Sequence, residues 1–174
     1  MLLKFVRFVE RKLTLKEIKK SCNVKGSINV RGRINIWNKN VLIGKNCTIY
    51  PGVTFWGNGP IKLGDNVKIG MNTVIYASEN AGVSISDNTS IAANCYLIDM
   101  NHGLAKDTLI QMQSNSAEKI EIGKDCWVGA NCVIGKGACM HDGAVLGATS
   151  FLNSSIPPYE IAAGSPAKII SRRK

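Results

Sequence analysis

Histidine and cysteine are the residue types in this chain best suited to acid–base, nucleophilic or metal chemistry. The chain has two histidines, His102 and His141. A histidine is the natural general base near neutral pH because its pKa lies there. Six cysteines are present, but none forms a Cys-x-x-Cys pair. With only two histidines beside them, a structural zinc site has little support, and we expect no bound metal.

The elements that position these residues follow from an apolar repeat of six residues. This period fits neither an amphipathic helix nor a flat alternating strand. It fits short strands joined by tight turns, three strands to a coil, with one aliphatic side chain of each strand pointing inward. The sequence therefore predicts an all-β solenoid of six coils. The repeat residues are Val24, Val30, Ile36, Ile43, Ile49, Phe55, Leu63, Ile69, Ile75, Ile85, Ile91, Leu97, Ile122, Val128, Ile134, Met140, Leu146 and Leu152.

Other positions of the repeat are also regular. Glycine often follows the inward residue, where we expect it to serve turns that need a positive φ. Small residues often lie four positions after the inward residue, and four of the six cysteines are among them. We interpret these cysteines as small, buried and inert. They are Cys47, Cys95, Cys126 and Cys132.

Extra residues interrupt the repeat only at corners. The largest interruption, between Leu97 and Ile122, predicts an extruded loop at residues 103–119. His102 lies at the root of this loop, where the backbone is held by a rigid coil and the side chain is open to ligands. His141 lies inside a regular hexapeptide and is assigned no role.

The two ends of the chain depart from the repeat. Residues 2–13 carry apolar residues at roughly helical spacing, and Thr14–Glu17 is a capping-box pattern that predicts the start of a second short helix. Pro157 and Pro158 are expected to end the repeat. We therefore divide the chain into an N-terminal helical segment (1–20), a solenoid domain with the 103–119 loop (21–157) and a basic C-terminal tail (158–174).

Charge and composition limit the function classes. Residues 1–45 hold twelve Lys and Arg against two Glu, which accounts for the whole net charge of +10. This concentration argues against a nucleic-acid partner. It fits either a solvated helix face or peripheral contact of residues 1–20 with an anionic membrane surface. With no apolar run of ~20 residues and no signal-peptide pattern, we expect a soluble, cytoplasmic protein.

The chain resembles the left-handed parallel β-helix acyltransferases built from hexapeptide repeats, and among them the O-acetyltransferases of sugars, galactosides (maltose and galactoside acetyltransferase-like) and polysaccharide building blocks. The resemblance covers about residues 24–170. Three segments carry it beside the repeat: Asp99–His102, Ile122–Asn131 and Ile156–Lys168. It implies left-handed coils, against the usual right-handed crossover of parallel sheets, and a homotrimer with active sites between subunits. The related γ-class carbonic anhydrases need three histidines on zinc, which this chain cannot supply.

The resemblance implies transfer of acetyl from acetyl-CoA to a saccharide hydroxyl in a direct ternary complex. His102 matches the family's catalytic histidine and would act as general base, with Asp99 or a backbone carbonyl orienting its ring. Positions that match the acetyl-CoA groove or offer cations to its phosphates are Trp127, Ala130, Ala148, Lys168, Arg172 and Arg173. Positions that match sugar-binding residues are Asn72, Glu79 and Asn80. Two alternatives stay open: N-acetylation of an amino sugar, and a non-catalytic β-helix scaffold.

Overall fold

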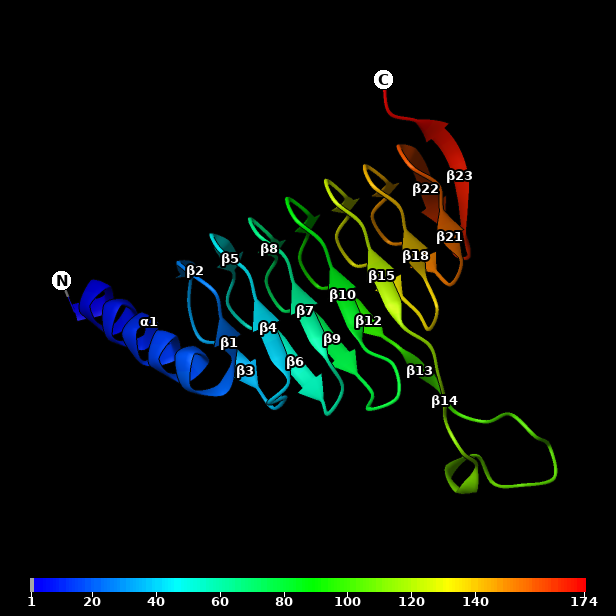
Figure 1. Cartoon of the computed structure of the whole chain (residues 1–174), viewed down its shortest axis with the longest axis horizontal. Helices are drawn as coiled ribbons and strands as arrows, with labels where there is room; N and C mark the ends of the chain where they lie inside the picture. The colour runs from blue at the N-terminus through cyan, green and yellow to red at the C-terminus, as the bar shows by residue number, and fades with distance from the viewer. Residues whose placement is uncertain (1) are drawn as a thin grey trace.

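A single long helix precedes the solenoid (Figure 1). The computed structural model describes residues 2–174, apart from the side chains of residues 2–5 and 7. Helix α1 spans Leu2–Ser21 without a break, so the expected second helix start at Thr14 is wrong. The Thr14 hydroxyl instead donates to the Glu10 carbonyl oxygen at 2.9 Å, a bond inside the helix. The apolar side chains at positions 2, 3 and 5 lie outside the described residues.

The end of α1 closes the open end of the solenoid. Ile18 is fully buried within the hydrophobic core, and Cys22 is nearly so. The Cys22 amide still donates to the Ile18 carbonyl at 2.8 Å, in the helical pattern. Ile18 lies six residues before Val24, in phase with the repeat, but it belongs to helix α1. A solenoid needs such a cap because its terminal coil has no neighbour to cover its apolar residues.

The solenoid is a left-handed β-helix with three sheets, named here A, B and C, each formed by stacked strands from successive coils. Sheet A contains β1 (Asn23–Val24), β4 (Val41–Ile43), β7 (Ile61–Leu63), β10 (Val83–Ile85), β15 (Ile120–Ile122), β18 (Cys139–Met140) and β21 (Ser155–Ile156). Sheet B contains β2 (Ile28–Val30), β5 (Cys47–Ile49), β8 (Lys68–Ile69), β11 (Ser90–Ile91), β16 (Trp127–Val128), β19 (Val145–Leu146), β22 (Glu160–Gly164) and β23 (Ala167–Arg172). Sheet C contains β3 (Asn35–Ile36), β6 (Thr54–Gly57), β9 (Val74–Ala77), β12 (Tyr96–Ile98), β17 (Val133–Ile134) and β20 (Phe151–Leu152).

These strands form the six predicted coils and a partial seventh. Within the described residues, all strand pairs are parallel except β22 with β23 and β13 (Met100–Asn101) with β14 (Ser116–Ala117). The prolines at 157 and 158 do not end the repeat, because β22 still pairs with β19 beyond them. Ile156 and Ala162 are buried and continue the inward rows. The last seventeen residues thus include a strand hairpin that covers the final coil.

The inward residues form the core as predicted. Sixteen of the eighteen repeat residues are buried, and the other two, Val24 and Ile36, are half-buried in the first coil. The repeat glycines, however, do not have the positive φ that we expected. Their role is to leave room for the backbone of the next coil. At Gly70 and Gly129 a Cβ would lie 2.4 Å from backbone atoms of the next coil, and neither has a positive φ. The positive-φ positions are taken by asparagines such as Asn46, Asn66 and Asn94 and by glycines outside this repeat position, such as Gly52 and Gly143.

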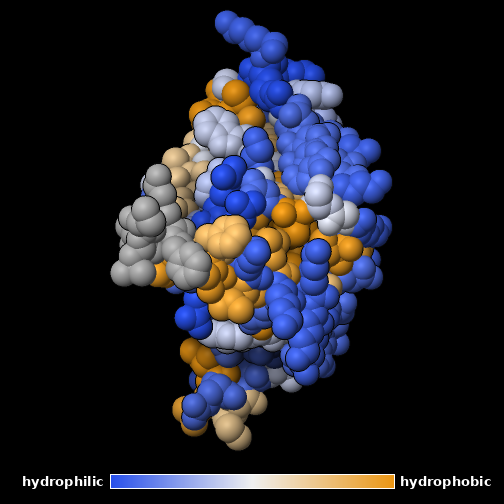
Figure 2. Space-filling view, turned by 90° about the vertical axis from the view of Figure 1, so that its left-hand side faces the viewer, coloured by the Kyte–Doolittle hydropathy of each residue, from blue (hydrophilic) through white to orange (hydrophobic). Residues whose placement is uncertain are grey.

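Figure 2 looks at the α1 end of the molecule and shows apolar atoms mixed with hydrophilic ones on this face. Val6, Phe8 and Leu13 of α1 are 43%, 53% and 62% exposed, respectively. Among the described residues, no helix is both long and apolar enough to cross a membrane.

The stacked core predicts a position-dependent stability loss. Replacing Ile69, buried in the third coil, with Ala should lower the unfolding free energy by about 3 kcal/mol, because a cavity forms that neighbours on both sides cannot fill. The same change at half-buried Ile36 should cost about 1 kcal/mol. Denaturant unfolding followed by circular dichroism measures both, and equal losses would contradict this account of the core.

Candidate active site

The edge where sheet C meets sheet A, here called edge CA, has the long corners of the solenoid. This edge is formed in successive coils by residues 58–60, 78–82 and 99–119. Buried polar side chains hold these corners in shape. Asn38 is fully buried, donates to the Gly59 carbonyl at 2.9 Å and accepts from the Asn40 amide at 2.7 Å. A long corner needs such support because its backbone groups leave the regular ladder.

Asp99 holds the next corner in the same way. It is fully buried, and its carboxylate accepts from the Ser78 amide at 2.9 Å and from the Gly82 amide at 2.6 Å. Bonds from backbone N–H groups to a carboxylate are among the stronger hydrogen bonds in proteins. Asp99 therefore shapes the corner that carries Glu79 and Asn80, and it does not serve the His102 ring as the sequence suggested.

His102 follows β13 at the root of the extruded loop. Strands β13 and β14 pair to form a two-stranded base, and Figure 1 shows the loop projecting from the side of the solenoid. The loop contains the short helix η1 (Ile110–Met112). It is tied by Gln113, whose side chain accepts from the Ala105 amide at 2.8 Å and donates to the Ala105 and Thr108 carbonyls at 2.9 and 2.7 Å.

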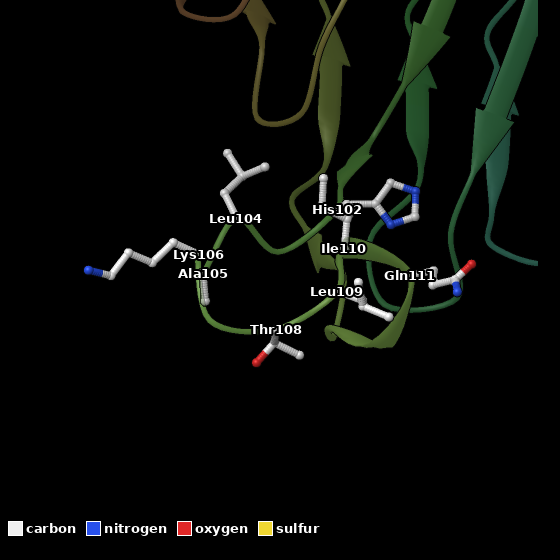
Figure 3. Close-up of a pocket in the computed structure, with 8 residues that line it drawn as sticks. All are labelled: His102, Leu104, Ala105, Lys106, Thr108, Leu109, Ile110 and Gln111. Carbon is white, nitrogen blue, oxygen red and sulfur yellow. The ribbon is translucent and has the colours of Figure 1, made fainter.

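The His102 side chain is exposed and lines a pocket of about 670 Å³ with loop residues 104–111. Figure 3 shows its ring turned to the side of the earlier coils, the same side as Gln111, while Lys106 points the opposite way. Within the described residues, no hydrogen bond engages the ring. The backbone is thus fixed while the imidazole is available to a substrate.

A second pocket of about 670 Å³ opens at the same edge, between the loop base and the earlier coils. Glu79 and Asn80 line it, as do Met100 and Asn115 from the loop base. The Glu79 carboxylate also accepts a hydrogen bond from the side-chain amide of Asn58 at 3.2 Å. Two of the three residues expected to bind sugar therefore lie on the edge that carries His102.

Sequence reasoning missed three aromatic residues in this second pocket. They are Trp37, Trp56 and Tyr76. A signal was present, because each directly follows the inward residue of the third strand of its coil, so its side chain points outward at the end of sheet C, next to edge CA. Successive side chains of a strand point alternately into the core and toward the surface, so an aromatic side chain at this position is on the surface.

Asn72 lies on a different edge, where sheet B meets sheet C, here called edge BC. Its side chain donates to Asn94 Oδ1 at 3.3 Å, in a ladder of turn asparagines. Ala130 and Ala148 lie further along the same edge, with the Thr149 amide bonded to the Ala130 carbonyl at 2.8 Å. Asn72 is thus aligned with the expected acetyl-CoA positions and separated from Glu79 and Asn80 by sheet C.

Trp127 lies on the outer face of sheet B and is 56% exposed. It pairs in register with Ser90 on one side and Val145 on the other. Sheet C separates this row and edge BC from edge CA. One chain by itself therefore places His102 on one side of sheet C and the expected acetyl-CoA positions on the other.

The C-terminal cations fall into two groups. Arg173 is engaged, because its guanidinium donates to the Asp125 carbonyl and carboxylate at 3.1 Å and to the Gly143 carbonyl at 3.0 Å. It fastens the end of the chain to the turns between sheets A and B through Nη1, and its expected role as a phosphate ligand stays a prediction. Arg172 is exposed and lies 4.0 Å from Glu160, and Lys168 is exposed on β23.

The cysteines are structural, as the sequence predicted for Cys47, Cys95, Cys126 and Cys132. All four are buried. The Cys126 thiol donates to the His141 carbonyl of the next coil at 3.2 Å, and burial raises its pKa to about 11. A thiol with a raised pKa is protonated at neutral pH and is a poor nucleophile. Among the described residues, no three His, Cys, Asp or Glu side chains gather in a metal-binding cluster.

Comparison with known proteins identifies the repeat. The family model "hexapeptide repeat of succinyl-transferase" matches residues 39–77 and 60–98, and "bacterial transferase hexapeptide (six repeats)" matches residues 119–154. Galactoside O-acetyltransferase of Escherichia coli is 33% identical over 68% of this chain. WbbJ of the same organism, assigned to lipopolysaccharide biosynthesis as an O-acetyl transferase, is 32% identical over 67%. The chain spans 61% and 63% of the length of these two relatives, respectively.

A solved structure shares the fold over nearly the whole chain. AntD, an N-acyltransferase from Bacillus cereus crystallised with dTDP and coenzyme A, superposes with a TM-score of 0.80 at 22% identity. The match covers 91% of this chain and 89% of AntD. The family models together match more than half of the 174 residues, in the coils that carry the site. This protein therefore belongs to the transferases built from hexapeptide repeats and folded as a left-handed β-helix.

Proposed function

We propose that this protein transfers the acetyl group of acetyl-CoA to a hydroxyl group of a saccharide. The observation that carries the proposal is the exposed imidazole of His102, fixed at the root of a tied loop on the edge that also holds Glu79 and Asn80. The O-acetyltransferases among its sequence relatives support the choice of reaction.

In the proposed reaction His102 accepts the proton of the acceptor hydroxyl while the oxygen attacks the thioester carbonyl. A C–O bond forms to the acetyl carbon and the C–S bond breaks. The imidazolium then returns the proton to the departing thiolate, so that coenzyme A leaves as the free thiol. A direct transfer fits this chain because the thiols of Cys47, Cys95, Cys126 and Cys132 are buried, where a substrate does not reach them to form a covalent acetyl-enzyme.

The site would be completed by a second copy of the chain. Sheet C presents apolar residues outward, among them Val74, Tyr96, Val133 and Phe151. If three copies form a closed ring with sheet C facing the axis, edge CA of one copy meets edge BC of the next. His102 of one subunit then faces the row of Trp127, Ala130 and Ala148 on its neighbour. This arrangement would unite the two halves that a single chain keeps apart, in a homotrimer with three sites.

In that trimer, acetyl-CoA would lie along edge BC of the neighbouring subunit. Its extended pantetheine arm suits the row of small residues at 130 and 148, since the coils there are packed without bulky side chains. The cations Lys168, Arg172 and Arg173 are the candidates for its phosphates, although Nη1 of Arg173 is already bonded to Asp125 and Gly143. N-acetylation of an amino sugar would use the same base, and the acceptor panel below separates the two reactions.

His102→Ala should lower kcat by about 100-fold or more, since a general base contributes at least that much. The KM for acetyl-CoA should change little. The measurement is thiol release from acetyl-CoA with a panel of neutral and amino sugars and oligosaccharides, and His141→Ala is the matched control. If His102→Ala still releases the thiol of coenzyme A, the protein is a transferase but His102 is not its general base. Absence of release together with absence of acetyl-CoA binding would favour a non-catalytic scaffold.

Asp99→Asn should raise the KM for the acceptor about ten-fold while the KM for acetyl-CoA stays near its wild-type value. The reason is that the side-chain amide lacks the carboxylate charge and places an NH2 donor where an oxygen now accepts a backbone N–H of Ser78 or Gly82, so the corner with Glu79 and Asn80 loses its shape. Asp87→Asn is the matched control, because Asp87 also accepts a backbone amide, that of Asp65 at 2.8 Å, on a remote edge. Equal kinetic effects of the two variants would refute the positioning role.

We also propose that α1 touches an anionic membrane surface. Phe8 and Leu13 are exposed, and Lys12, Lys16 and Lys20 lie on the same helix. Phe8→Ser with Leu13→Ser should weaken sedimentation with vesicles of phosphatidylcholine and phosphatidylglycerol about five-fold. Deleting the helix is unsuitable because Ile18 caps the core. Ile170→Ser, at the opposite end of the chain, is the control, and unchanged sedimentation of the double variant would exclude this contact.

A further inference from the structure

Three aromatic side chains form a ladder along edge CA. Trp37, Trp56 and Tyr76 come from the first, second and third coils, where the register of sheet C sets Trp56 opposite Tyr76. The ring centroids of Trp37 and Trp56 lie 6.3 Å apart, and those of Trp56 and Tyr76 lie 5.1 Å apart. Adjacent rings are nearly perpendicular, and Trp37 and Trp56 remain 66% and 45% exposed. Aromatic groups of this size rarely stay exposed together without a partner.

The same pocket has a polar side. Asn58, Glu79, Asn80 and Asn115 supply amide donors, amide oxygens and a carboxylate within the space lined by the aromatic ladder. The Ser78 side chain lines this pocket too, and its hydroxyl oxygen is buried without a hydrogen-bond partner among the described residues.

We propose that this pocket binds an oligosaccharide, so that the acceptor is a chain of sugars and not a single sugar. The inference rests on the proposed function and extends it. A sugar ring has apolar C–H faces, which stack on aromatic rings, and hydroxyl edges, which need both donors and acceptors. The ladder and the opposing amides present these two surfaces in one pocket. A lipid chain would need apolar walls on both sides.

The ladder also gives the acceptor a direction. The rings occupy coils one to three, His102 leaves the fourth coil, and Ala130 and Ala148 lie on coils five and six. The His102 ring is turned to the side of the earlier coils (Figure 3). The oligosaccharide thus extends from His102 over the N-terminal coils, while acetyl-CoA approaches from the C-terminal ones. One sugar at the corner of Glu79 and Asn80 receives the acetyl group, and the following sugars stack on Tyr76, Trp56 and Trp37.

Calorimetric binding of malto- and chito-oligosaccharides of one to four sugars, without acetyl-CoA, tests the proposal. Wild type should bind the tetrasaccharide of at least one series about ten-fold more tightly than its monosaccharide. Trp37→Ala and Trp56→Ala should each lower the tetrasaccharide affinity about five-fold and leave the monosaccharide affinity unchanged. Tyr159→Ala, which removes an exposed aromatic from the remote edge between sheets A and B, is the matched control and should change neither affinity.

Three results would overturn the oligosaccharide site. They are no binding of either series, affinities that do not depend on chain length, and tryptophan variants that bind as wild type does. Light scattering of the same variants tests the competing occupant, a second copy of this chain. If Trp37→Ala and Trp56→Ala change the oligomeric state, the ladder is a subunit contact and the proposal fails. Length-dependent binding without any acetyl transfer would keep this site and reject the proposed reaction instead.

Discussion

The stacking of one coil on the next is the interaction on which the rest of this structure depends. No coil can bury its own apolar residues, because each strand contributes only one or two inward side chains. The inward row of Ile49, Ile69 and Ile91 becomes a core only when parallel strands bring these residues into register. Backbone amides and carbonyls of neighbouring coils are satisfied by the same stacking. Glycines such as Gly70 allow the coils to approach this closely.

The regularity of the coils makes the irregular places informative. At the edge between sheets A and B the turns are short and are held by asparagine and aspartate side chains. At edge CA the corners are long, and they persist because Asn38 and Asp99 replace the missing ladder bonds from within the protein. Each of these buried groups belongs to a neighbouring coil, so the shape of one corner depends on the presence of the next coil. The candidate site is located at these supported corners.

The solenoid axis gives the site its order. The groups proposed to bind the acceptor lie on the N-terminal side of His102, and the positions expected to bind acetyl-CoA lie on its C-terminal side and across sheet C. This separation explains why a single chain is an incomplete catalyst in the proposed mechanism. Both ends of the solenoid are covered. Helix α1 covers the first coil, and the β22–β23 hairpin, which Arg173 fastens, covers the last.

The sequence by itself determined the coils, the inward rows, the extruded loop and the position of His102 at its root. It could do so because a six-residue period reflects local strand and turn geometry, repeated in every coil. The burial of Cys126 followed from the same period. The unbroken α1, the seventh partial coil and the C-terminal hairpin were decided by tertiary contacts, since they form to cover the ends of the core. Likewise, only the structure shows that Asp99 serves the neighbouring corner, that Arg173 is engaged, and that Trp37, Trp56 and Tyr76 form one ladder. The three aromatic residues are 19 and 20 positions apart along the chain, and only the stacking of coils brings them together.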